Sequence, residues 1–442
     1  MSDSNVRYVG LDVHKRVVEA CLLDDEGKVL RRDRLDLSRS YLETYGREVL
    51  RPTDRVALEA TTNTWAVVRV LRPHVAAVVV SNPLATKAIA AAKVKTDKVD
   101  ALVLAQLLRC DYLPSVWQPD EATQEMRRLT AHRASLVGDR TRLKNRLHAV
   151  LAMRLIAPPC ADLFSVEGRD WLAAVELDAE GRLLLDSDLR LLGHVEAEIE
   201  QLDKLLAQKA YPQQAVKLLM TLPGVNVAVA LALVAAWGDI GRFASPDQAA
   251  SYLGLVPSTR QSADKCYHGP ITKAGRSQAR WMLVQAAHHV RNHPGPLGVF
   301  FRRLAKKKNY NVAVVATARK LAAIGWQMLK HNEPYRYAQP RPTQDKLARL
   351  RVAATGKRRT SGPPKGAKCQ AKLPGGSRTI KPLATVYEQE HLPPLSAPKP
   401  AERRVLAAGE LTEFAASLGV EQIVPRRKGG SRTKNEPQAA TK

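Results

Sequence analysis

The stretch "RYVGLDVHKRVVEACLLDDEGKVLRRDRL", residues 7–35, contains the clearest secondary-structure signals in the amino-terminal part of the chain. It contains three short runs of strand length, "RYVGLDV", "VVEACLL" and "KVLRRDRL". "DDEG", from Asp24 to Gly27, supplies a hairpin turn between the last two runs. We therefore expect the chain to open with a meander of three strands.

Helix and strand patterns alternate after this meander. A helix is expected around residues 41–50, a strand at 55–60, a helix in "NTWAVVRVLRP" and an apolar strand at 75–80. The stretch from Pro83 to Arg109 is then mostly helical, and the prolines of "YLPSVWQPD" close the region. This order predicts a ribonuclease-H-like α/β domain over residues 1–118, in which the first and fourth strands are neighbours.

Helices with heptad spacing are expected over residues 119–210. One apolar series repeats every seven residues and a second is spaced by three and four: Leu129, Leu136, Leu143 and Val150, then Leu192, Val195, Ile199, Leu202 and Leu206. Such seams favour a coiled-coil arm or a dimerisation hairpin. The alternative is that both seams pack within their own domain.

A third, mostly helical domain is expected over residues 211–337. "LPGV" between two helical runs resembles a helix-hairpin-helix, whose turn amides can contact a phosphate backbone, although a plain helix pair fits equally well. The small, polar and basic stretch 256–275 is expected to be a loop on nucleic acid. A helix that carries Arg276 and Arg280 should begin at Thr272 or Lys273.

The composition changes again over residues 338–442. This segment is rich in Gly, Pro and Lys and poor in apolar residues, so most of it is expected to be a disordered basic tail. A short helix is possible near residues 407–418. Residues 341–442 carry 21 Lys and Arg against 8 Asp and Glu, so the tail contributes half of the formal net charge of +26.

A positive balance of this size indicates a polyanionic partner, most often nucleic acid. The charge is not confined to the tail, so the folded part is basic as well. The 5 cysteines are scattered and form no C-x-x-C pair, which favours a reducing cytosol over a zinc site or a disulfide framework. Without a signal peptide or an apolar run of about 18 residues, the sequence predicts a soluble cytoplasmic protein.

Four carboxylates are expected to converge in the first domain. Asp12 ends the first strand, Glu59 ends the fourth, and the i,i+3 spacing puts Asp97 and Asp100 on one helix face. Two like charges about 4 Å apart repel by about 4 kcal/mol at an effective dielectric constant of about 20. A cluster of hard oxygen ligands therefore predicts bound Mg²⁺, with two ions expected. His14 is expected at the surface or supporting a ligand rather than binding the metal.

Ser262 lies in the polar stretch of the third domain. Taken alone, it would be an ordinary loop hydroxyl. No G-x-S-x-G motif surrounds it, so a hydrolase-type nucleophile is not indicated.

Taken together, these motifs resemble one family. "GLDVHK", "LEAT", "SNP" and "KTDKVDA" are similar to the amino-terminal domain of the DEDD insertion-sequence transposases, also called bridge-RNA-guided recombinases. "LPGV", "YLGLVPSTRQS" and "ITKAGRSQAR" are similar to the carboxy-terminal transposase domain of that family. The resemblance covers about residues 6–337, with the motifs in the family's order.

The resemblance implies a RuvC-like fold and makes Ser262 the nucleophile, five residues after Pro257 in the family's pattern. It also assigns the four acids of the family name to Asp12, Glu59, Asp97 and Asp100. The residue after the serine, commonly glycine in the family, is Ala263, which is a departure from the family's pattern. Cations that could hold the attacked phosphate are Lys273, Arg276 and Arg280.

The family's activity implies donor and target DNA, a structured guide RNA and a homo-oligomer as partners. In that family the serine attacks a DNA phosphodiester and strand exchange reseals it, so the bond energy is conserved and no ATP is needed. The absence of a G-x-x-x-x-G-K-[ST] motif agrees with this. Two other readings stay open: a metal-dependent hydrolytic nuclease such as a junction resolvase, and a nucleic-acid-binding protein without catalysis.

Overall fold

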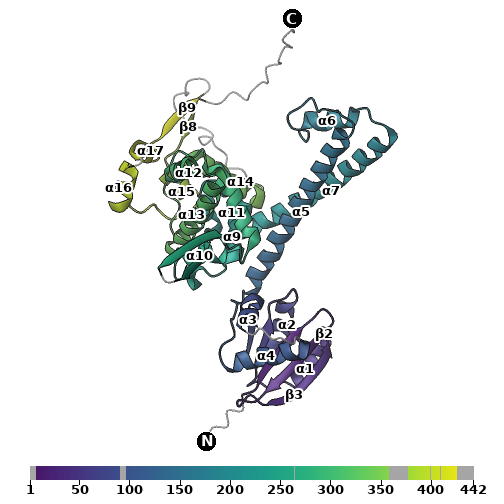
Figure 1. The fold of residues 1–442 in the computed structure, drawn as a ribbon. Coiled ribbons are helices and arrows are strands. Elements are labelled where there is room, and N and C mark those ends of the chain that lie inside the picture. The colour runs from purple at the N-terminus through teal and green to yellow at the C-terminus, as the bar shows by residue number, and fades with distance from the viewer. Residues whose placement is uncertain are drawn as a thin grey trace. The chain divides into compact units, whose positions relative to one another are not determined.

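The computed structural model describes residues 6–89, 96–262, 264–357, 377–398, 400–408 and 410–425. The chain divides into two compact units, Met1–Asp120 and Glu121–Lys442 (Figure 1). Each unit has its own hydrophobic core and is described by itself.

The first unit is built on a five-stranded sheet with the order β3-β2-β1-β4-β5. Strand β1 is antiparallel to β2 and parallel to β4, and β4 is parallel to β5. The first and fourth strands are therefore neighbours, as the sequence predicts. The strands are β1 (Tyr8–Val13), β2 (Val17–Leu23), β3 (Val29–Asp36), β4 (Arg55–Glu59) and β5 (Ala77–Ser81).

Helices cover both faces of this sheet. Leu42 of α1 and Leu71 of α2 pack with Leu11 on one face. On the other face, Ala101 and Leu104 belong to α4, which packs against β1, β2 and β4. The helical segments of the unit are α1 (Arg39–Glu48), α2 (Thr64–Leu71), η1 (Arg72–His74), α3 (Pro83–Ile89) and α4 (Asp97–Arg109).

Gly10 allows α4 to lie directly on the sheet. A Cβ atom at this position would lie 2.0 Å from the carbonyl oxygen of Ala101 and 2.7 Å from the amide nitrogen of Ala105. Real Cβ atoms do not approach backbone atoms this closely, so any other residue would push the helix away. The glycine of "VGLDV" thus sets the position of the helix that carries two of the predicted acids.

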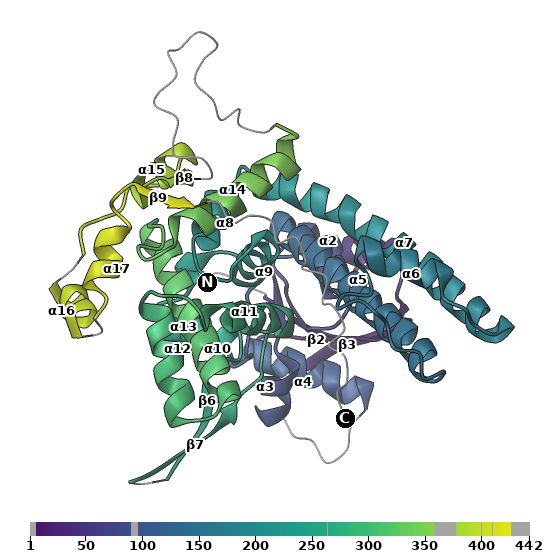
Figure 2. The same ribbon diagram turned by 90° about the horizontal axis from the view of Figure 1, so that it is seen from above.

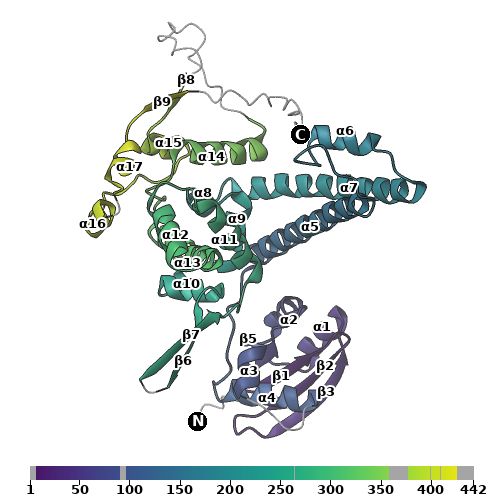
Figure 3. The same cartoon turned by 45° about the horizontal axis from the view of Figure 1, so that its top comes forward.

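The second unit begins with a long helical hairpin made of α5 (Glu121–Ala152), α6 (Val166–Ala174) and α7 (Ala179–Ala210). Helices α5 and α7 run side by side (Figure 3). Their seam is filled within the chain, because Leu143, Leu147 and Val150 of α5 share one core with Leu185 and Leu192 of α7. The heptad seams therefore form an arm by packing on each other and do not remain for a second protomer, which corrects the dimerisation reading.

The rest of the helical core follows this arm. The bundle consists of α8 (Gln214–Met220), α9 (Val227–Trp237), η2 (Ile240–Arg242), α10 (Pro246–Tyr252), α11 (Ser277–Val290), α12 (Pro296–Lys307) and α13 (Tyr310–His331). Of the helices that the structure describes, α13 is long and apolar enough to cross a bilayer, which the sequence analysis did not predict. Half of its most apolar window is buried, and Ala318 and Leu321 lie in the core.

Strands β6 (Pro257–Ser262) and β7 (Lys265–Ile271) form an antiparallel hairpin where the sequence predicts a loop. The hairpin projects from the helical bundle (Figure 2). The stretches "STRQS" and "KCYHG" do not alternate between apolar and polar residues. Hydropathy patterns therefore do not identify them as strands. Helix α11 begins at Ser277 rather than at Thr272 or Lys273, because Lys273 has a positive φ of 54° and Arg276 is the residue before the first turn.

The segment after residue 337 is partly folded, which corrects the prediction of a disordered tail. Leu347 and Leu350 are buried in the main core of the unit, together with Val386 and Tyr387. The described elements are α14 (Pro340–Thr355), β8 (Ser377–Ile380), α15 (Leu383–Gln389), α16 (Pro400–Ala408), α17 (Thr412–Ser417) and β9 (Gln422–Pro425). Residues 358–376 and 426–442, which hold much of the predicted low-complexity sequence, lie outside the described residues.

Candidate functional site

The predicted acids of the first unit gather where the strands end beside the start of α4. Leu11 of β1 pairs with Leu58 of β4, so Asp12 and Glu59 follow at equivalent positions. Gly10 and Ala57, two residues earlier, both face α4. Because side chains alternate along a strand, Asp12 and Glu59 share that face.

Helix α4 brings the other two acids to the same place. Thr96 caps the helix, since its side chain accepts a hydrogen bond from the Val99 amide, and Asp97 and Asp100 occupy the first turn. The helix dipole stabilises carboxylates at this end, so Asp97 and Asp100 also suit a purely structural role at the helix N-terminus. Their position over the strand ends is what makes them candidate ligands.

The closest contact in the cluster is made by His14. Its Nε2 atom lies 3.0 Å from Oδ2 of Asp12 and 3.3 Å from Oδ1 of Asp97. The three side chains can direct one ligand atom each to a common point, because those atoms lie within 4.8 Å of one another. The sequence analysis placed His14 outside the ligand set, whereas the structure puts it between two of the acids.

The electrostatics of the cluster favour a cation. Burial raises the pKa of Asp12 above its ordinary value, the ion pair and hydrogen bond with His14 oppose the rise, and the charges of Asp100 and Asp97 add to it. Burial is the largest cause of the raised pKa, and a bound cation would offset both the loss of hydration and the repulsion from the neighbouring acids. Carboxylate oxygens backed by a histidine fit a divalent metal ion, and Asp12 and Asp97 are the residues best placed to hold it.

A fifth acid, Glu19, lies beside Asp12 and was missed by the sequence analysis. Glu19 of β2 is the direct partner of Asp12 in the β1–β2 register, and only 6% of its surface is exposed. Its Oε1 lies 3.5 Å from Nη1 of Arg34. The tight turn at residues 14–16 between β1 and β2 fixes this register, so counting outward from that turn was the signal that could have found Glu19.

The second group of predicted residues lies on the β6–β7 hairpin. Ser262 is the last residue of β6, is exposed, and pairs with Lys265 of β7. Directly opposed residues of an antiparallel pair point to the same face, so a lysine stands beside the serine. His268 of β7 pairs with Thr259 of β6 and contacts the Thr259 Oγ1 atom at 3.1 Å. Thr259 precedes Ser262 by three residues along β6, so His268 is not the cross-strand neighbour of the serine. Ala263 lies outside the described residues.

Lys273, Arg276 and Arg280 lie at the base of the hairpin. Nη1 of Arg280 donates to the carbonyl oxygens of Leu253 and Ala274, at 2.9 and 3.0 Å. A strand of six residues spans roughly 17 Å, so this chain does not bring these cations next to Ser262. The pairing of Ser262 with Lys265, which needs the strand register, was not foreseen.

An arginine cluster surrounds Tyr252 at the same base. Burial acts to raise the pKa of the Tyr252 hydroxyl, but the hydrogen bond from Arg276 and the charges of Arg276, Arg127 and Arg242 outweigh it and lower that pKa. Arg127 also donates to the carbonyl oxygens of Ala235 and Ala236 at the end of α9, at 2.7 and 2.9 Å. This cluster anchors the hairpin to the bundle and makes its base strongly positive.

Comparisons with known proteins match the region of the acid cluster and the region of the serine hairpin separately. Residues 9–154 match the family model of the DEDD transposases of the IS110 type, and residues 216–299 match that of the IS116/IS110/IS902 transposases. The first match contains the acid cluster and the second contains the serine hairpin. These family-model matches identify the chain as a transposase, an enzyme that cuts and rejoins DNA.

Curated relatives carry the same description. The chain is 27% identical to the transposase for insertion sequence element IS1111A of Coxiella burnetii over 76% of this chain and 93% of the relative. It is 28% identical to a probable family 20 transposase of Pseudomonas aeruginosa over 75% and 99%, respectively. A putative transposase of Sinorhizobium fredii is 30% identical, but over only 55% of its own length. The chain belongs to the IS110/IS116/IS902 family of insertion-sequence transposases.

Proposed function

We propose that this transposase breaks and rejoins DNA through a covalent phosphoserine at Ser262, with the acid cluster of a RuvC-like domain holding Mg²⁺. The observation that carries the proposal is the placement of Ser262. It is exposed at the end of a projecting hairpin, where a DNA phosphate can reach its hydroxyl.

The hydroxyl of Ser262 attacks a phosphodiester, forms an oxygen–phosphorus bond and releases a sugar hydroxyl. Attack by a second sugar hydroxyl on the phosphoserine then reseals the strand and frees the serine without net hydrolysis. Lys265, opposite Ser262 in the register, is placed to hold the attacked phosphate and to offset its developing charge. The cations at the hairpin base contact more distant phosphates.

The acid cluster supplies the second half of the chemistry. When bound, Mg²⁺ would neutralise charge on the attacked phosphate and on the leaving oxygen. Asp12 and Asp97 are the principal ligands in this proposal, with Glu59 and Asp100 completing the set and His14 orienting Asp12. Glu19 lies opposite Asp12 in the register but forms an ion pair with Arg34, so it is not assigned a ligand role in this proposal.

Donor and target DNA are the proposed substrates, and a structured RNA is the proposed guide. The positive charge is spread over the chain, which suits the recognition of nucleic-acid shape and backbone. When base pairing selects the sequence, the protein needs such surfaces more than a base-reading helix. The protein is expected to act in the cytoplasm.

The deciding experiment compares Ser262→Ala with Ser251→Ala, a change at an exposed serine of α10. Strand cleavage, covalent adduct formation and recombination are measured with donor DNA, target DNA and the candidate RNA. Ser262→Ala should abolish the adduct and recombination, whereas Ser251→Ala should retain both. Recombination at the wild-type level by Ser262→Ala would refute the serine mechanism.

A hydrolytic nuclease remains the second candidate, because the acid cluster alone provides a metal site for water attack on DNA. In that case Ser262→Ala would keep full cleavage activity and would form no adduct. Asp12→Asn would abolish activity under both mechanisms, so it separates both from a protein that only binds nucleic acid.

A homo-oligomer is still proposed, but on a different surface from the heptad seams. Leu184, Leu191 and Leu205 of α7 are exposed by 40%, 47% and 40% and lie at multiples of seven residues, so they share one outer stripe. Leu184→Glu with Leu191→Glu should lower the oligomeric state in light scattering without unfolding the arm. Unchanged mass in the presence of RNA and DNA would remove this surface from consideration.

A further inference from the structure

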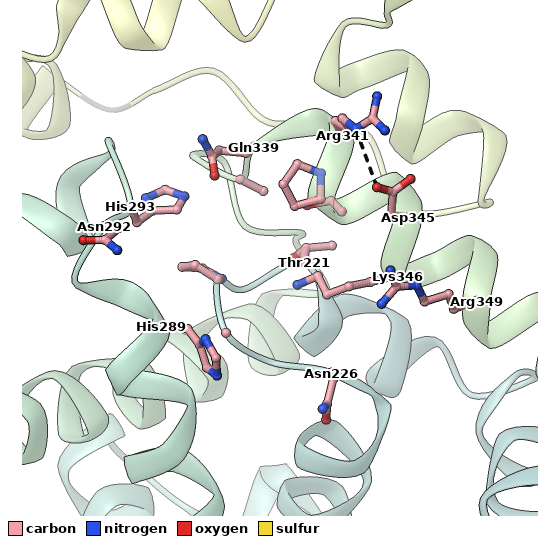
Figure 4. Close-up of a pocket in the computed structure, with 15 residues that line it drawn as sticks. Thr221, Asn226, His289, Asn292, His293, Gln339, Arg341, Asp345, Lys346 and Arg349 are labelled. Carbon is pink, nitrogen blue, oxygen red and sulfur yellow. Dashed lines mark ion pairs between the residues drawn. The ribbon is translucent and has the colours of Figure 1, made fainter. Parts of the chain in front are cut away.

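A cavity of about 580 Å³ lies where the L-P-G-V turn meets α14 (Figure 4). Its wall comes from three segments that are distant in sequence: the turn at residues 221–226, the end of α11 with residues 289–293, and residues 338–349. The volume is within the range typical of ligand sites. Helix α14 belongs to the segment whose composition predicts disorder and lies beyond both family-model matches.

Lys346 of α14 holds the turn. Its Nζ donates to the carbonyl oxygens of Leu222 and Val225, at 2.8 and 3.0 Å, which are the carbonyls that flank Pro223 and Gly224. Burial lowers the pKa of Lys346 to about 7. Because both carbonyl oxygens bond to the same ammonium group, Lys346 stabilises one conformation of the turn at the cavity wall.

His293 presents a buried donor at the same cavity. The amide of Gly295 donates to its Nδ1 at 3.1 Å, so the hydrogen of the neutral ring is on Nε2. Burial, together with the charges of Lys346 and Arg302, lowers the pKa of His293 to about 4, so the ring is neutral near pH 7. Nε2 is buried and has no hydrogen-bond partner among the residues that the structure describes.

An unsatisfied buried donor is costly, which makes an acceptor from a ligand favourable. Only 5% of the His293 surface is exposed, and Figure 4 shows its ring turned toward the other lining residues. The unpaired Nε2 donor of His293 therefore favours a ligand that accepts a hydrogen bond.

The charge of the lining identifies the chemistry of that ligand. Three basic side chains and one carboxylate line the cavity. Arg341 pairs with Asp345 at 3.7 Å, and Lys346 is engaged by the two turn carbonyls and has a pKa lowered to about 7, so Arg349 is the described lining cation that can supply charge to a ligand. The remaining polar lining consists of the amides of Asn226, Asn292 and Gln339, the hydroxyls of two threonines and the imidazole of His289. Cations together with neutral donors favour a phosphate group, and the volume leaves room for the attached nucleotide.

We propose that this cavity binds one backbone phosphate, with its nucleotide, of a nucleic-acid strand. The inference rests on the proposed function only in taking nucleic acid as the partner. In the bound state His293 donates to a phosphate or sugar oxygen, and Arg349 provides the charge. Helix α14 thus adds a second wall to the L-P-G-V turn and makes it one side of a partly open subsite.

The first test measures how binding depends on salt. Arg349→Gln is compared with Arg303→Gln, which removes the same charge from an exposed position on α12. Full-length protein is titrated into labelled single-stranded RNA, single-stranded DNA and duplex DNA of one sequence over a range of salt concentrations. Loss of one phosphate contact should lower the slope of log K against log salt by about 0.7 to 0.9 and weaken binding about tenfold for Arg349→Gln alone.

The three probes assign the strand that occupies the cavity, since only the cognate one should show the change in slope. Equal slopes for Arg349→Gln and Arg303→Gln with all three probes would overturn the proposal. Orthophosphate and a nucleoside monophosphate are titrated separately. If they bind at the cavity while all oligonucleotide slopes stay unchanged, the site is one for free anions and the nucleic-acid assignment is wrong.

The second test uses His293→Phe, which keeps an aromatic ring and removes the donor. It should weaken binding of the cognate strand several-fold and leave the salt slope unchanged, because no charge is lost. Thermal unfolding checks that the variant is folded, and binding unaffected by a folded His293→Phe would count against the histidine contact. Both tests measure binding and do not depend on the reaction at Ser262. Repeating them in the Ser262→Ala background separates failure of the cavity proposal from failure of the serine mechanism.

Discussion

The acid cluster and the serine hairpin are built in opposite ways. Asp12 sits at the end of a buried strand, with helices on both faces of its sheet, and its side chain is only 17% exposed. Ser262 sits at the end of a two-stranded hairpin in which nearly every side chain is exposed. A metal site needs ligands fixed by packing, whereas a nucleophile that attacks DNA must be reachable by a large substrate.

This difference indicates how the two halves of the site should respond to change. The cluster is preorganised by the sheet, so it is sensitive to small displacements of α4. A two-stranded hairpin is only marginally stable alone in water, so its conformation depends on what it contacts. We expect nucleic acid to order the hairpin, while the acids are already in place.

The largest expected effect is the loss of catalysis from either half. Asp12→Asn should lower strand cleavage by at least about 10³-fold, because it removes a ligand and the charge that binds the cation. Excess EDTA should have the same effect on the wild type. Cleavage is measured on labelled DNA, and circular dichroism confirms that the variant is folded. Wild-type activity in EDTA would refute the metal site.

A smaller effect on activity, but a clear one on stability, is expected at Gly10. Gly10→Ala should destabilise the first unit by about 3 kcal/mol, because its Cβ would overlap the backbone of α4. Gly193→Ala on α7 is the matched control, since nothing lies within 4 Å of the added Cβ there. That control should be neutral or stabilising by up to about 1 kcal/mol. Equal unfolding midpoints in urea would show that α4 is less constrained than described.

Around the serine, the register predicts which neighbour matters. Lys265→Gln should lower the rate of adduct formation about 10- to 100-fold, because the amide cannot offset the charge of the attacked phosphate. His268→Ala should retain most of the activity, since His268 pairs with Thr259 instead of Ser262. The reverse order of the two effects would mean that the hairpin changes register on DNA.

The smallest effect is dynamic and needs no mutation. Amide hydrogens of β6 and β7 should exchange with solvent much faster than those of β1 and β2, because the hairpin lacks a buried face. Addition of DNA should slow exchange in the hairpin and leave the strands of the sheet unchanged. Equal protection in the free protein would contradict the contrast between the two regions.

Much of the first unit could be predicted from sequence because its signals are local. The turn at Asp24 to Gly27, the apolar strands and the capped helix from Asp97 gave the sheet order and the neighbourhood of Asp12. Glu19 was missed because its role depends on which residue lies opposite it, and hydropathy says nothing about that. The contact of His14 with Asp97 could not be predicted for a similar reason, since it joins a strand end to a helix distant in sequence.

The amino-acid sequence alone indicates a nucleic-acid partner, the two motif-bearing regions and two acids, Asp12 and Asp97, that the folded chain brings together. These follow from charge, strand and helix periodicity, and short-range spacing. Only the tertiary structure decided that the heptad seams pack on each other, that Ser262 stands opposite Lys265, and that α14 closes a cavity with His293 and Lys346. An apolar stripe or a single cation can contact many different segments of the same chain. Which segment it contacts depends on how distant segments pack together in one core, and local sequence patterns do not contain that information.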